Sequence, residues 1–265
     1  MLGLGNRVGK TALITPGIVT DGLKLKHNYN AGSVVPVSDG AALFNGTSDT
    51  ITCGSDSSID DIFDGGGTVS AWIFALDIGE NDYGRIIDKT DAASNPSKGW
   101  SIHIRDEAGG GTTAKLSMVQ AWDSNDGIWA TGNTAIVYNQ WNHIAVTYNN
   151  AAHGNNPIFY INGALISVTE SSTPTTDGTR FTDAAEVWTI GNRAGGTDRT
   201  WDGYICNVGA WEAILTQPQI KSIMFKSYAD LTTSETTNLV SWWNIDEGTG
   251  TSVEDSHGSN DGAFA

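Results

Sequence analysis

The sequence predicts an all-β fold, a two-sheet antiparallel sandwich with one short helix after the last main strand. Short apolar runs rich in β-branched and aromatic residues follow one another along the chain, and segments rich in Gly, Asn, Asp and Ser separate them. The composition, with 32 Gly, 10 Trp and 17% charged residues, suits many turns between buried strands. A length of 265 residues allows one large sandwich domain.

Two runs in the first half of the chain show contrasting strand patterns. Thr68–Leu76 is apolar on both alternating faces, which predicts an interior strand covered on both sides. Gly99–Arg105 alternates apolar residues with Ser101 and His103, which predicts a half-buried strand.

The clearest local turn signal lies in Pro157–Val168. Asn162 and Gly163 tolerate positive φ, so they predict a two-residue type I′ hairpin between apolar arms. Further strands are expected in Ala114–Trp122, Trp141–Asn149, Val187–Asn192 and Trp201–Glu212.

One helix is expected after these strands. Thr216 is a favourable N-cap, and Gln219 three residues later completes a capping box. Ile220, Ile223 and Met224 form an apolar stripe at helical spacing. The pattern predicts a short helix packed on a sheet edge.

The charge and the cysteine content narrow the function classes. A formal net charge of -16, with only 14 Lys and Arg, argues against a nucleic-acid partner. No apolar stretch reaches the roughly 18 residues of a membrane span, and the N-terminus lacks a signal-peptide pattern, so synthesis in the cytoplasm without membrane insertion is expected. Cys53 and Cys206 lie in apolar runs and are expected to be buried free thiols, with a bridge between neighbouring strands as the alternative.

Six segments of the chain resemble segments of one known family and occur in the same order as in that family. The chain is similar to the laminin-G-like jelly roll, the concanavalin-A-like sandwich shared by laminin G modules, pentraxins and many lectin-like domains. The similar segments are Ala42–Cys53, Thr68–Leu76, Asn139–Asn149, Phe159–Ile166, Val187–Asn192 and Trp201–Ile220.

The resemblance implies a structural calcium site near the loops of the first and last of these segments. Asp49 and Asp202 stand at positions matching the family pattern, and Asn45 offers a neutral oxygen, the ligand type that calcium prefers. Where the family tends to carry acidic residues, this chain has Cys206 and Asn207. The alternative is that both aspartates only cap turns.

The same sandwich also carries glycosidases, whose paired carboxylates alternate along a strand. That pattern is absent here. Glu80–Arg85 lies in a turn-like stretch and ends in arginine, and the adjacent carboxylates of Asp106 and Glu107 would point to opposite faces of a strand. The five histidines have no zinc-type spacing. The sequence therefore predicts a protein that is not an enzyme.

A sugar-binding platform is the remaining hypothesis for a site. Tryptophan faces stack on sugars, and nearby Asn and Asp side chains hydrogen-bond to hydroxyl groups. The candidate residues lie in Ala121–Asn133 and are Trp122, Asp123, Asn125, Asp126 and Trp129. The alternative is that both tryptophans are core residues and the segment between them is a hairpin turn.

A module of this family normally works outside a cell, yet the chain shows no export signal. The sequence hypothesis is a non-enzymatic phage virion component, a capsid decoration or a tail or fibre module on the virion exterior, that contacts other virion proteins or copies of itself and binds host glycans. Residues 1–17 would form a flexible arm and residues 18–235 the sandwich. A secreted bacterial adhesin or lectin-like carbohydrate-binding module, and a glycoside hydrolase with an unfamiliar carboxylate arrangement, are the alternatives.

The last segment, residues 236–265, resembles the opening of a module. Leu239–Gly262 combines a strand with apolar residues on both faces and an acidic, glycine-rich turn, although Asp21–Tyr29 already offers an opening strand. Apolar surface on both faces must be covered. The segment is expected to pack back onto its own sandwich, and donation to a neighbouring subunit is the alternative.

Overall fold

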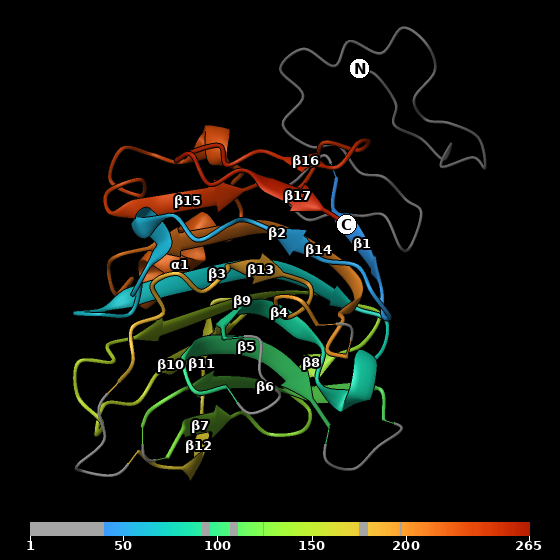
Figure 1. Ribbon diagram of the computed structural model, residues 1–265. Helices are drawn as coiled ribbons and strands as arrows, with labels where there is room; N and C mark the ends of the chain where they lie inside the picture. The colour runs from blue at the N-terminus through green and yellow to red at the C-terminus, as the bar shows by residue number, and fades with distance from the viewer. Residues whose placement is uncertain (1–39, 92–95, 107–110, 124, 175–179, 197) are drawn as a thin grey trace, which may run out of the picture. The chain divides into compact units, whose positions relative to one another are not determined.

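The structure is a computed structural model of the chain. It describes residues 40–91, 96–106, 111–123, 125–174, 180–196 and 198–265. The predicted arm, residues 1–17, and the candidate opening strand Asp21–Tyr29 lie outside these residues. Within them the strands form two antiparallel sheets, which confirms the predicted all-β sandwich (Figure 1).

The first sheet has the strand order β1-β14-β3-β9-β10-β11, and β15 also pairs with β14. Its described strands are β1 (Ala42–Asn45), β3 (Gly67–Ala75), β9 (Trp141–Tyr148), β10 (Ile158–Ile161), β11 (Ala164–Ile166), β14 (Asp202–Trp211) and β15 (Leu239–Trp243).

The second sheet has the order β12-β7-β6-β5-β4-β13-β2-β17-β16, and β8 pairs with β6. Its described strands are β2 (Ile51–Thr52), β4 (Arg85–Thr90), β5 (Gly99–Arg105), β6 (Thr113–Gln120), β7 (Gly127–Ala130), β8 (Ile136–Val137), β12 (Thr169–Ser172), β13 (Thr189–Ile190), β16 (Ser252–Val253) and β17 (Gly262–Phe264).

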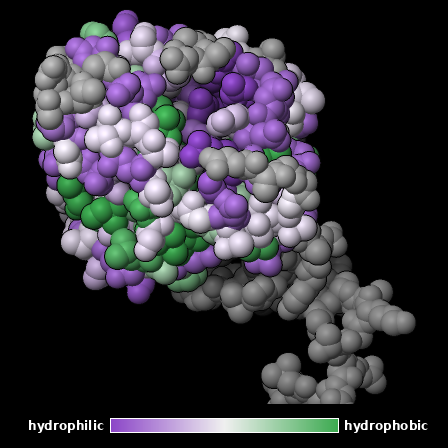
Figure 2. Space-filling view, turned by 90° about the horizontal axis from the view of Figure 1, so that it is seen from below, coloured by the Kyte–Doolittle hydropathy of each residue, from purple (hydrophilic) through white to green (hydrophobic). Residues whose placement is uncertain are grey.

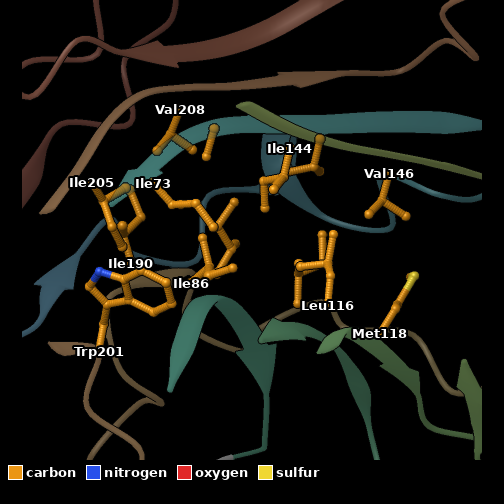
Figure 3. Close-up of a cluster of buried hydrophobic side chains, with 14 of the residues drawn as sticks. Ile73, Ile86, Leu116, Met118, Ile144, Val146, Ile190, Trp201, Ile205 and Val208 are labelled. Carbon is orange, nitrogen blue, oxygen red and sulfur yellow. The ribbon is translucent and has the colours of Figure 1, made fainter. Parts of the chain in front are cut away.

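The main core fills the space between the two sheets. Ile73, Ile144 and Val208 of the first sheet point toward Leu116 and Ile190 of the second (Figure 3). Because side chains alternate along each strand, the residues between these core positions point to the outer faces of the sheets.

Local turn chemistry folds as the sequence predicts. Asn162 and Gly163 have φ values of 50° and 71° and connect β10 to β11, which confirms the hairpin. Every residue of β3 is buried, which confirms an interior strand covered on both sides.

The helix α1 (Gln217–Ile223) confirms the predicted helix but not its place. The backbone N–H of Thr216 donates to Gln219 Oε1 at 2.9 Å, as expected in a capping box. The expected position at a sheet edge is wrong, because Ile220 and Ile223 cluster with Tyr160 and Trp211 of the first sheet. The outer face of this sheet is apolar, and a face buries more of the helix than an edge does.

The C-terminal segment pairs with both sheets of the same chain. β15 is hydrogen-bonded to β14, and β17 pairs with β2 although the two strands lie far apart in sequence (Figure 1). Trp243 packs in the core between the sheets, and Trp242 packs in the cluster around α1. The apolar surface on both faces of β15 is thereby covered.

Both cysteines are free and buried, as expected. Cys53 follows β2 of the second sheet, and Cys206 lies in β14 of the first sheet.

Candidate functional site

A pocket of about 220 Å³ opens on the outer face of the second sheet, across β4, β5, β6 and β7. Hydrophilic residues also border a hollow on the face of the molecule shown in Figure 2. The pocket is lined by Tyr83, Arg85, Pro96, His103, Arg105, Val119, Asp126, Ile128 and Arg199. We call it the arginine pocket, because three of these residues are arginines.

Strand alternation places the pocket side chains on this face. In β5, Ile102 and Ile104 belong to the core between the sheets, so Ser101, His103 and Arg105 point outward. The prediction of a half-buried strand is wrong, because Ser101 and His103 on the outer face are also buried.

A bulge in β4 brings an ion pair to the same face. The register with β5 shifts between Arg85 and Ile87. In a regular strand, residues three apart point to opposite faces, but Arg85 Nε lies 3.1 Å from Asp88 Oδ2. The other carboxylate oxygen of Asp88 accepts hydrogen bonds from Thr90, which hold the carboxylate in place.

Arg85 also fixes the protonation of its neighbour in β5. Arg85 Nη1 lies 2.7 Å from Ser101 Oγ and 2.6 Å from His103 Nδ1. A guanidinium only donates, so His103 Nδ1 accepts and the ring proton lies on Nε2. Burial, together with the positive charges of Arg85 and Arg105, lowers the pKa of His103 well below its ordinary value of 6.5. His103 is therefore a neutral side chain with one N–H donor.

An aromatic residue and a cation stack at the rim of the pocket. The guanidinium carbon of Arg199 lies 5.0 Å from the centroid of the Tyr83 ring, and this ring lies 5.8 Å from that of His103. Tyr83 is 37% exposed, so part of its ring is open to solvent.

The backbone holds these rim residues together. Arg85 N–H donates to the carbonyl of Arg199 at 2.9 Å. Gly79 has a φ of 83°, and a side chain there would come within 2.6 Å of the backbone of Gly84 and of Thr200. Only glycine allows this close approach of the two segments.

The predicted sugar platform is only partly at the pocket. Asp126 lines it, whereas Asp123 and Asn125 are exposed outside the residues that line it. Burial raises the pKa of Asp126 above its ordinary value of 3.8, although the backbone N–H of Trp122 donates to its carboxylate.

Both tryptophans of the predicted platform lie in the interior, so the expectation of two exposed stacking faces is corrected. Trp129 is fully buried, packs 5.4 Å from the ring of Tyr148 and donates Nε1–H to Asn156 Oδ1. Trp122 is 7% exposed. Trp129 belongs to the core because its position in β7 faces the first sheet.

Sequence reasoning missed most of the pocket residues. The sequence pattern places Tyr83 and Arg85 in a turn-like stretch and gives no role to Arg199. The available signal was the polar face of Gly99–Arg105, which carries His103. Its meaning depends on which strand lies beside it.

Two of the three candidate calcium residues, Asn45 and Asp49, hydrogen-bond to each other in a turn. Asn45 Oδ1 accepts hydrogen bonds from the backbone N–H groups of Thr47, Ser48 and Asp49, and both carboxylate oxygens of Asp49 accept from Asn45. Asp202 is the register partner of Asn45. The oxygens that calcium would need from Asn45 and Asp49 are thus engaged in a turn. Calcium binding stays a prediction from the resemblance.

Two further classes of feature are absent from the described part of the chain. No group of three or more His, Cys, Asp or Glu side chains there is placed to hold a metal ion. Within the same residues, no helix combines the length and apolarity that crossing a bilayer requires.

Comparison with protein families identifies the fold family. Residues 41–221 match the model of the concanavalin A-like lectin/glucanases superfamily that describes laminin G domains. The chain belongs to this family. A search of curated proteins finds no match.

Two solved structures share the fold of this laminin-G-like protein. A candidate carbohydrate-binding protein from Bacteroides ovatus has a TM-score of 0.56 at 17% identity, over 84% of this chain and 57% of that one. Tailspike protein 2 of an Escherichia coli O157:H7 bacteriophage has a TM-score of 0.50 at 12% identity, over 83% of this chain and 28% of that one. The chain therefore spans only part of the length of either protein.

Proposed function

We propose that this protein is a non-enzymatic carbohydrate-recognition protein that binds its glycan in the arginine pocket. The observation that carries the proposal is the combination, in one hollow, of an exposed aromatic ring at Tyr83 with fixed donors and an acceptor at His103, Arg199 and Asp126. Sugar rings need an aromatic face and a few oriented polar groups. The fold shared with a candidate carbohydrate-binding protein supports the same class of ligand.

The carboxylates support a binding role rather than hydrolysis. Glycosidases of the common mechanisms use two carboxyl groups on either side of the scissile bond. Of the residues that line the pocket, Asp126 alone carries a carboxylate.

A glycan microarray with the purified chain tests the proposal. We expect binding to a defined set of saccharides, and we expect Tyr83→Ala to weaken it by about tenfold because the stacking surface is lost. Phe225→Ala is the matched control, since Phe225 is an exposed aromatic residue that is not among the pocket residues. An array without any bound glycan would refute the proposal. Release of reducing sugar from a glycan would show that the protein is a glycoside hydrolase instead.

We further propose that the protein acts on the exterior of a phage particle. The fold shared with a phage tailspike supports this placement, and an adhesin or lectin released from a bacterium is the alternative. Immunogold labelling of particles purified from the source organism tests it. Labelled particles support the virion placement, and protein found only free in the culture medium contradicts it.

A further inference from the structure

The arginine pocket gathers basic side chains on a strongly acidic chain. The chain has 30 acidic residues against 14 Lys and Arg, a net charge of -16. Among the residues that line the pocket, by contrast, Arg85, Arg105 and Arg199 are basic and Asp126 alone is acidic. We infer that the pocket takes an acidic saccharide, one whose sugar ring carries a carboxylate. This inference rests on the proposed function and names the ligand class of the same site.

Arg85 is a fixed part of the pocket floor rather than the main ligand contact. Its side chain is buried and its charge is balanced by Asp88 at 3.1 Å. Its role is to hold His103 neutral, with the Nε2–H as a donor. A neutral donor stabilises an anion without requiring its own charge to be buried.

Arg199 is placed to meet the ligand at the rim. Its Nη1 donates to the carbonyl of Asp198 at 2.8 Å, whereas the nearest Asp198 carboxylate oxygen lies 3.7 Å away, beyond a normal hydrogen bond. The guanidinium carbon also lies over the ring of Tyr83, which limits the positions that the group can take. An oriented guanidinium presents parallel N–H groups that match the two oxygens of a carboxylate.

Asp126 supplies an acceptor for a sugar. Its carboxylate oxygens can accept hydrogen bonds from sugar hydroxyl groups, a contact that a simple inorganic anion does not make. The exposed part of the Tyr83 ring adds a surface on which the apolar face of a sugar can stack. The pocket therefore offers separate contacts for the carboxylate, the hydroxyl groups and the ring of one acidic sugar.

A second hollow extends the site along the same sheet. This hollow, of about 480 Å³, shares Arg105 with the arginine pocket and also includes Lys115. Arg105 and Lys115 are register partners on β5 and β6. The remaining lining is mostly small or polar and consists of Ala130, Thr131, Gly132, Asn133, Thr169 and Ser171. Basic and polar side chains thus continue from one hollow to the next, which fits an oligosaccharide.

Calorimetric titration with three matched oligosaccharides tests the inference. The probes are an oligogalacturonate, its carboxyl-reduced neutral counterpart of the same length, and a sulfated form of that neutral chain. We expect the oligogalacturonate to bind at least about tenfold more tightly than the neutral chain, and its affinity to fall as salt rises. The sulfated chain should bind more weakly than the oligogalacturonate, because a tetrahedral sulfate matches the planar donor pair less well than a carboxylate does.

Variants assign the preference to the pocket. Arg199→Gln and Arg105→Gln should each remove most of the difference between the acidic and the neutral chain. Arg199→Lys keeps the charge but loses the paired donors, so it should retain part of the difference. Lys221→Gln on α1 is the charge-matched control and should change nothing, since α1 packs on the other sheet. Thermal melting of each variant shows whether it is folded, and Arg199→Lys serves where a glutamine variant fails to fold.

The outcomes separate this inference from the proposed function. Equal binding of acidic and neutral chains that is sensitive to Tyr83→Ala would overturn the acidic ligand and leave a glycan site standing. Equal binding of the sulfated and carboxylated chains would overturn the carboxylate class. No binding of any probe, together with an empty glycan array, would overturn both proposals.

Discussion

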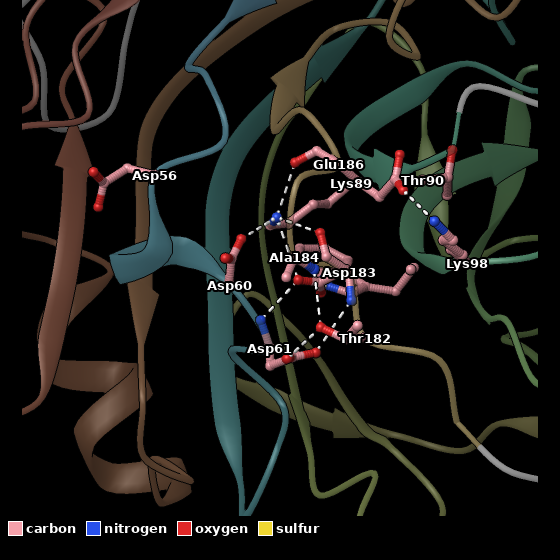
Figure 4. Close-up of polar contacts among 12 residues, drawn as sticks. Asp56, Asp60, Asp61, Lys89, Thr90, Lys98, Thr182, Asp183, Ala184 and Glu186 are labelled. Atoms are coloured by element: carbon pink, nitrogen blue, oxygen red, sulfur yellow. Dashed lines mark hydrogen bonds and ion pairs between the residues drawn. The ribbon is translucent and has the colours of Figure 1, made fainter.

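Lys89 is a fully buried cation that joins three segments of the chain (Figure 4). Its Nζ lies 2.8 Å from Asp60 Oδ1 and 3.2 Å from Asp183 Oδ1, and it donates to the carbonyl groups of Asp183 and Glu186. The second carboxylate oxygen of Asp183 accepts the indole N–H of Trp100 at 3.0 Å. The network links β4 to the segments before β3 and before β13. The ammonium group has three N–H donors, and four oxygen atoms lie close enough to accept from them.

Removing this ammonium group should destabilise the fold strongly. Lys89→Met would leave the buried carboxylate of Asp183 without its cation, and we expect a loss of about 3–5 kcal/mol in the free energy of unfolding. Lys98→Met is the control, because Lys98 is 47% exposed and pairs with Glu186 at the surface, so about 0–1 kcal/mol is expected. Urea denaturation measures both. Equal losses for the two variants would show that burial of the Lys89 network contributes little.

At the scale of elements, β14 organises the edge of the first sheet. β1 pairs with its first half, from Asp202 to Ile205, and β15 pairs with its second half, from Val208 to Trp211. Between them the register with β3 shifts, and Asn207 adopts a φ of 47°. Its backbone N–H donates to the carbonyl of Asn244 at 3.0 Å. One long strand therefore supports two short strands from opposite parts of the sequence.

The strand β15 should contribute directly to stability through Trp243. This side chain is fully buried, its ring lies 5.6 Å from that of Trp188, and its indole N–H donates to the carbonyl of Asn260. We expect Trp243→Ala to lower the free energy of unfolding by about 3–5 kcal/mol. Phe225→Ala, at an exposed aromatic residue, should change it by less than about 0.5 kcal/mol.

Thermal melts of the wild-type protein at several concentrations distinguish packing within one chain from exchange between chains. If β15 pairs with its own β14, the melting temperature does not depend on protein concentration, and the folded protein elutes as a monomer. A melting temperature that rises with concentration would favour donation of residues 236–265 to a neighbouring subunit.

At the scale of the whole molecule, two layers of core are built on a strongly acidic chain. One core lies between the sheets, and a second lies between the first sheet and α1. A net charge of -16 favours solubility of the protein. The arginine pocket, with three basic residues in its lining, is an exception on this acidic chain. The charge distribution and the local geometry therefore favour the same candidate site.

The two thiols report on opening of the whole sandwich. Cys53 and Cys206 are buried in different sheets, and burial raises the pKa of both thiols above the ordinary value of 9.0. We expect neither to react with a thiol reagent in the folded protein at neutral pH, and both to react at one common rate set by global unfolding. Fast labelling of one cysteine alone would indicate that its sheet opens locally.

The features that local sequence determines are those whose causes lie within a few residues. Asn162 and Gly163 define a tight hairpin because they tolerate positive φ, and Thr216 and Gln219 begin a helix because their side chains satisfy its first N–H groups. The nearly continuous apolar run Thr68–Leu76 likewise indicates a strand buried on both faces. Together with the order of the strand segments, these patterns were sufficient for the all-β sandwich.

Only the tertiary structure decided where the candidate site lies. Arg85 meets His103 because a bulge and the β4–β5 register bring them together, and Arg199 joins them across more than ninety residues of sequence. Trp129 is buried, while Asp126 three residues earlier lines the pocket, because the orientation of β7 directs one toward the core and the other toward the outer face. Residue types show which groups can bind a sugar, but strand register and sheet pairing decide which of them face the same hollow.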